Sequence, residues 1–188
     1  MNLREHAFAL VSVVLGLALT QLLSNLNDLI SARKHIRWYP LPLIWAATAF
    51  AVVTNYWWGM FLGVTGVDLP ESAASFMLRL LLPVCAFLLC ASTLPKVANV
   101  ESQRDLRLYY YSERRYYFGL WIAFAALSSI EITSVAGAWT WGPANIFRMA
   151  MSLLILPLLF TRAPWYHWIA AVGSLVILCW RMVGQMLH

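Results

Sequence analysis

Residues 117–136 read YFGLWIAFAALSSIEITSVA, a run of 20 residues in which Glu131 is the single charged side chain. A helix needs about 20 mostly apolar residues to cross the hydrocarbon core of a membrane. A carboxylate inside such a helix is costly unless a partner neutralises it. The run therefore predicts a membrane span and, close to Glu131, a basic side chain from another span.

The composition of the whole chain points to lipid as its main solvent. Of 188 residues, 62% are hydrophobic and 11% are charged, whereas soluble domains carry about 25% charged residues. Six runs have the length and composition of a span: 7–30, 39–62, 72–94, 117–136, 143–160 and 164–186. We therefore predict an all-α fold, a single domain of six transmembrane helices with short loops. Five spans and a re-entrant segment are the alternative, because the fifth run is short and contains Arg148.

Two prolines lie beyond the first turn of a predicted span, Pro83 in the third and Pro157 in the fifth. Proline removes a backbone hydrogen bond and bends a helix. We expect kinks at both positions.

The orientation of the spans follows from their Lys and Arg residues, which favour cytoplasmic loops. The loops after the first, third and fifth spans, including the polar loop 95–116, hold nine such residues: Arg33, Lys34, Arg37, Lys96, Arg104, Arg107, Arg114, Arg115 and Arg162. The opposite side holds Arg4 and Arg181. Both termini are thus predicted to lie on the non-cytoplasmic side.

Three charged side chains are predicted to lie at one depth in the outer half of the membrane. At 1.5 Å of rise per residue, Glu131, Arg79 and Arg148 lie roughly 8–10 Å below the outer boundary, each on a different span. Arginine can bind a carboxylate through two parallel hydrogen bonds. This charged layer is either an interhelical clamp or the border of a water-filled anion site.

A polar stripe runs along the first span. Ser12, Gly16, Thr20, Ser24 and Asn27 fall in one sector of a helix, and Gln21, Asn25 and Asp28 widen it toward the cytoplasm. Asn55 adds a polar side chain in the second span. Such a stripe is expected to face another helix, where small residues permit close packing, or a water path.

Signatures of catalysis, metal binding and nucleic-acid binding are missing from the sequence. There is no HExxH, G-x-S-x-G or glycine-rich phosphate loop, and Cys85, Cys90 and Cys179 lie in apolar runs without metal-binding spacing. We expect neither an enzyme nor a bound cofactor, metal or nucleic acid.

Two functions remain open. The first is a small channel or transporter, homo-oligomeric and located in a bacterial inner (plasma) membrane, with a path lined by the polar stripe and the charged layer. The second is a non-transporting sensor or anchor subunit that docks a cytoplasmic partner protein. Its docking residues would be Arg104, Arg107, Arg114 and Arg115.

Overall fold

The computed structural model describes residues 3–61, 73–96, 104–136 and 142–186, and nearly all of them are helical. Six α-helices are present in this part of the chain: α1 Leu3–Ser31, α2 Pro40–Phe61, α3 Ala73–Thr93, α4 Leu106–Ala136, α5 Pro143–Ile155 and α6 Pro164–Met186. Two 3₁₀ turns and two short strands complete the order: η1 Arg33–His35, β1 Ile36–Arg37, β2 Arg104–Asp105 and η2 Leu156–Leu159. The prediction of an all-α fold is confirmed.

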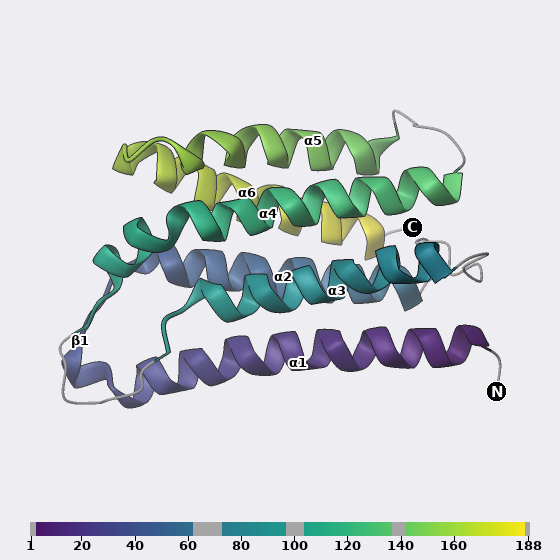
Figure 1. Ribbon diagram of the computed structural model, residues 1–188. Helices are drawn as coiled ribbons and strands as arrows, with labels where there is room; N and C mark the ends of the chain where they lie inside the picture. Colours follow the sequence, from purple (N-terminus) through teal and green to yellow (C-terminus); the bar gives the residue numbers. More distant parts are fainter. Residues whose placement is uncertain (1–2, 62–72, 97–103, 137–141, 187–188) are drawn as a thin grey trace.

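The helices lie side by side in one bundle, with α1 along one edge and α5 along the other (Figure 1). Helix α1 begins and α6 ends at the same end of the bundle, and β1 lies at the opposite end. The main contacts join α1 to α3, α3 to α4, and α2 to α6. Helices that are neighbours in the sequence are thus not always the closest neighbours in space.

Two of the described helical segments, His6–Ser31 and Leu106–Thr133, are long and apolar enough to cross a membrane. Two shorter apolar segments, Arg79–Thr93 and Asn145–Leu159, belong to α3 and to α5 with η2. The described α-helices equal the predicted spans in number. Two of them are long and apolar enough to cross a membrane, so six spans remain a prediction.

Helix α1 is held to α3 by a buried amide. Asn25 is 1% exposed, and its Nδ2 donates hydrogen bonds to the carbonyl oxygens of Ala91 and Leu94, each at 3.2 Å. The Nε2 of Gln21 donates to Asn25 Oδ1 at 2.8 Å. These bonds satisfy the amide and fix the register between α1 and the C-terminal end of α3.

The loops at the β1 end of the bundle are joined to each other. Strands β1 and β2 pair in parallel, with Ile36 opposite Arg104 and Arg37 opposite Asp105. Arg37 also forms an ion pair with Asp105 at 3.7 Å. Asp105 Oδ1 accepts a hydrogen bond from the backbone N–H of Arg107 at 2.8 Å. Asp105 therefore caps the start of α4, as aspartate commonly does.

A chain of buried hydrogen bonds links α2, α4 and α6 near the same end. Trp45 Nε1 lies 3.2 Å from the hydroxyl oxygen of Tyr110, and that hydroxyl lies 2.8 Å from Nδ1 of His167. The other ring nitrogen of His167 lies 3.1 Å from the carbonyl oxygen of Thr161. One assignment of protons satisfies every group: Trp45 donates to Tyr110, Tyr110 donates to Nδ1, and Nε2–H donates to Thr161.

The two internal prolines act differently from each other. Pro83 lies inside α3, which continues as an α-helix from Ala73 to Thr93. Pro157 lies in η2, where the chain leaves α-helical geometry after Ile155 and forms a 3₁₀ turn. At Pro157, where a kink was expected, the chain changes from α-helical to 3₁₀ geometry. Among the cysteines, Cys85 and Cys90 are buried as apolar residues, whereas Cys179 is exposed.

Candidate functional site

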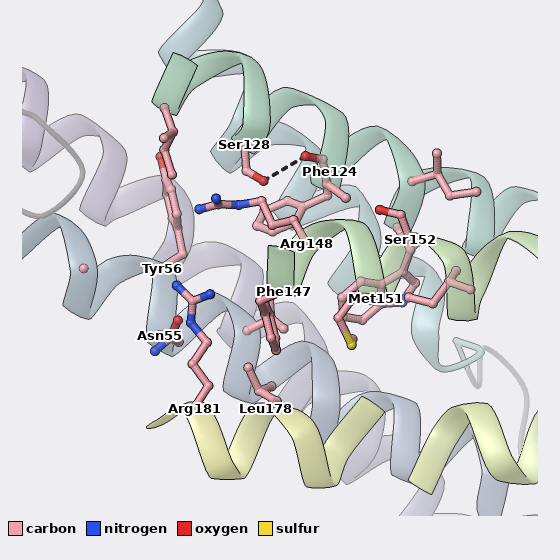
Figure 2. A pocket seen from close by; sticks show the side chains of 17 residues that line it. Asn55, Tyr56, Phe124, Ser128, Phe147, Arg148, Met151, Ser152, Leu178 and Arg181 are labelled. Atoms are coloured by element: carbon pink, nitrogen blue, oxygen red, sulfur yellow. Dashed lines mark hydrogen bonds between the residues drawn. The ribbon is translucent and has the colours of Figure 1, made fainter. Parts of the chain in front are cut away.

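A cavity of about 130 Å³ lies between α2, α4, α5 and α6. Figure 2 shows its wall, to which all four helices contribute side chains. The polar members of the wall are Asn55, Tyr56, Ser128, Arg148, Ser152 and Arg181. The large apolar members include Trp121, Phe124, Phe147, Met151, Ile155 and Leu178. A mostly apolar wall with a few convergent polar groups is the usual composition of a small-molecule site.

Two arginines from different helices converge at one end of the cavity. Arg148 of α5 and Arg181 of α6 extend their guanidinium groups toward Tyr56 (Figure 2). Arg148 donates a hydrogen bond to Asn145 Oδ1 at 3.0 Å. The guanidinium carbon of Arg181 lies 4.6 Å from the centre of the Phe147 ring, in a cation–π contact. The Nε atom of Arg181 is buried and has no hydrogen-bond partner within the described chain.

Glu131 of α4 lies beside this cationic end. Its side chain is buried, and both carboxylate oxygens lie 3.4 Å from the hydroxyl of Tyr56, which donates to them. Arg79 of α3 and Arg148 both act on Glu131 electrostatically, Arg79 more strongly. Tyr56 lines the cavity and therefore connects the carboxylate to the cavity wall.

The predicted charged layer corresponds to residues that the fold brings into one region. Glu131, Arg79 and Arg148 come from α4, α3 and α5 and interact electrostatically. Sequence reasoning missed Arg181, which it counted as a residue of the outer boundary. With Arg181, which acts electrostatically on Arg148, the described residues of this region include three arginines and one carboxylate.

The polar stripe of the first span is placed differently from the expectation. Thr20, Ser24 and Asn27 are exposed on the outer face of α1, whereas the buried face is apolar and carries Asn25. The hydroxyl of Thr20 donates to the Gly16 carbonyl of its own helix at 2.8 Å. Apart from Ser12, the stripe thus faces away from the bundle instead of lining a path through one chain.

The remaining predicted polar residues have separate positions. Ser12 is partly buried and accepts a hydrogen bond from Trp57 Nε1 of α2 at 3.2 Å. Gln21 binds Asn25, as described above, and Asp28 is partly exposed on α1. Asn55 lines the cavity. Of the predicted path residues, Asn55 is therefore the one that belongs to the cavity wall.

The predicted docking arginines do not form one exposed group. Arg114 is 5% exposed, and its guanidinium donates to the carbonyl oxygens of Thr161 at 2.8 Å and Phe160 at 3.5 Å. Arg107 and Arg115 are exposed, while the side chain of Arg104 lies outside the described residues. Arg114 thus holds α4 to the turn between η2 and α6, which is a structural role.

Among the described residues, no group of three or more His, Cys, Asp or Glu side chains is placed to hold a metal ion. Comparisons of the chain with protein families, with curated proteins and with solved structures find no match.

Proposed function

We propose that this chain is a six-span membrane protein that binds small anions in the cavity between α2, α4, α5 and α6 and carries them across the membrane. The observation that carries the proposal is the cavity wall itself, whose described residues include two partly buried arginines, Arg148 and Arg181, and no carboxylate. Buried arginines are costly when uncompensated. An anion in the cavity supplies the missing negative charge.

The proposed membrane location has support from the outer surface of the bundle. Large apolar side chains are exposed on all six helices, among them Leu17, Phe61, Leu81, Ile130, Leu153 and Trp180. Soluble monomers rarely expose contiguous apolar surface on this scale. We place the chain in a bacterial inner membrane, with β1 and β2 on the cytoplasmic side.

Anion flux through purified protein in liposomes tests this function. We expect wild-type protein to pass chloride and acetate faster than potassium or sodium. Arg148→Gln should slow the anions about tenfold, because removing one buried charge contact costs on the order of 1.5–3 kcal/mol. Arg33→Gln is the matched control, since Arg33 is exposed in η1 and far from the cavity.

Two results would contradict the proposal. One is wild-type flux no faster than that of protein-free liposomes. The other is equal passage of cations and anions.

We further propose that two or more copies associate through the exposed stripe of α1. Gly16 and Ser24 are small, and a Cβ placed on Gly16 meets no atom of the chain within 4 Å. Small residues at four-residue spacing allow helices in a membrane to approach closely, and exposed Asn27 can hydrogen-bond across such a contact.

Gly16→Leu is accordingly expected to weaken self-association about tenfold or more without disturbing the fold, because the space beside Gly16 is empty within one chain. Single-molecule photobleaching in liposomes would count the subunits. Ala123→Leu enlarges an exposed residue of α4 and serves as the control. An unchanged subunit count for Gly16→Leu, or the same fall in both variants, would rule out the α1 contact.

A docking subunit is the second candidate function. A shallow hollow at the β1 end is lined by Arg107, Tyr111, Ser112 and Arg162, so two basic side chains flank one depression. Absence of flux, together with loss of a co-purifying protein on reversing the charges of Arg107 and Arg115, would favour this alternative.

A further inference from the structure

We infer that the ligand of the cavity is a small organic monocarboxylate with an apolar body about the size of one ring. Its carboxylate would lie between Arg148 and Arg181, and its body would lie among the apolar side chains of α4, α5 and α6. The assignment rests on the proposed anion function and names the class of anion.

The cationic end of the cavity has the donors that a carboxylate needs. Arg148 and Arg181 lie close enough to repel each other electrostatically, and an anion between them removes that repulsion. The contact with Phe147 holds the guanidinium of Arg181 at this wall, and its buried Nε has no acceptor in the described chain. Guanidinium groups bind carboxylates through paired, charge-assisted hydrogen bonds. Asn55, on the same wall, adds an amide.

The rest of the wall favours a hydrocarbon body over an inorganic ion. Trp121, Phe124, Met151, Ile155 and Leu178 contribute apolar surface to the cavity. Such surface favours apolar groups over water. A cavity of about 130 Å³ is close in size to the engineered cavities of roughly 150 Å³ that take up benzene. Chloride would leave most of this space and surface unused.

The two arginines lie at one end of the cavity along the bundle. Arg148 is the sixth residue of α5, and Arg181 lies five residues before the end of α6. Met151 and Ile155 follow Arg148 on α5 toward the middle of the bundle. In Figure 2 the guanidinium groups lie at the end beside Tyr56, and Met151 and Ser152 lie away from it. An acid with a polar head and an apolar body thus has one orientation here, with its body toward the middle.

Equilibrium dialysis with the full chain in lipid nanodiscs tests this inference with benzoate, benzamide and acetate as probes. Benzamide keeps the ring and loses the charge, whereas acetate keeps the charge and loses the ring. We expect wild-type protein to bind benzoate at least about tenfold more tightly than either. Arg181→Gln should weaken benzoate binding about tenfold or more, and Arg33→Gln should bind as wild type does.

A variant that fills part of the cavity tests the apolar contacts of the ligand independently of the arginines. Ser152→Leu places a larger side chain in the cavity wall and leaves both guanidinium groups in place. We expect it to weaken benzoate binding at least about tenfold and acetate binding by less than about threefold.

The outcomes separate this inference from the proposed function. Benzamide bound as tightly as benzoate would overturn the carboxylate assignment. Acetate bound as tightly as benzoate, with anion flux retained, would overturn the apolar body and leave anion transport standing. No binding of any probe together with no anion flux would overturn both.

Discussion

Glu131→Gln is expected to lower the free energy of unfolding by about 1–3 kcal/mol, because it takes the carboxylate acceptor away from Tyr56 and the negative partner away from two arginines. Glu131 is 6% exposed and accepts a hydrogen bond from Tyr56. Arg79 and Arg148 act on it electrostatically from two other helices. The amide keeps the shape of the carboxylate but leaves these guanidinium groups without their negative partner.

Equilibrium unfolding in mixed micelles, followed by circular dichroism, would measure this loss. Glu113→Gln is the matched control, since Glu113 is an exposed glutamate on the same helix. Surface substitutions of this kind usually change stability by less than about 0.5 kcal/mol. Adding Arg79→Gln to Glu131→Gln should recover part of the loss, because the double variant removes opposite charges together. Equal, small effects of Glu131→Gln and Glu113→Gln would show that the charges do not hold the helices together.

Tyr110→Phe is expected to cost about 2–4 kcal/mol of unfolding free energy. The change removes one oxygen atom but leaves two buried groups unsatisfied, the N–H of Trp45 and Nδ1 of His167. Each orphaned buried polar group costs about 1–3 kcal/mol. The residue stays aromatic, so ring contacts such as that with Phe118 persist.

The same unfolding measurement applies to this variant, with Tyr116→Phe as its control on an exposed tyrosine of α4. Near-ultraviolet circular dichroism should also change for Tyr110→Phe, because Trp45 is buried and loses its hydrogen-bond acceptor. A cost below about 0.5 kcal/mol would mean that the bonds to the Tyr110 hydroxyl do not stabilise the fold.

The positions of the helices could be predicted from the sequence because apolar length and proline fix them locally. The predicted second, fifth and sixth spans begin at or within one residue of Pro40, Pro143 and Pro164, where α2, α5 and α6 start. The neighbours of each helix could not be predicted. Contact between α1 and α3 depends on Asn25 meeting carbonyl groups more than 60 residues away, and no local pattern encodes that distance.

Part of the charged region could also be predicted from the sequence. Depth along a span follows from counting residues, so Glu131, Arg79 and Arg148 could be placed at one level. Arg181 sits near a helix end, where counting alone assigns basic residues to the boundary. Its direction into the cavity depends on how α6 packs against α2 and α5.

The polar stripe shows the limit of helical periodicity. Spacing places Gly16, Thr20 and Ser24 on one face but does not say what covers that face. The expectation that the stripe faces another helix or a water path rested on keeping polar groups out of lipid. Thr20 instead donates to the carbonyl of Gly16 in its own helix, so its polarity is satisfied without a neighbouring helix.

The bond between Asn25 and α3 has a consequence for biosynthesis. A ribosome adds about 5–20 residues per second, and Ala91 follows Asn25 by 66 positions. Roughly 3–13 s therefore pass between synthesis of the amide and synthesis of its acceptor. During this interval α1 has been synthesised but α3, the helix it contacts most, has not. A chaperone or insertase that shields the nascent α1 would act during these seconds.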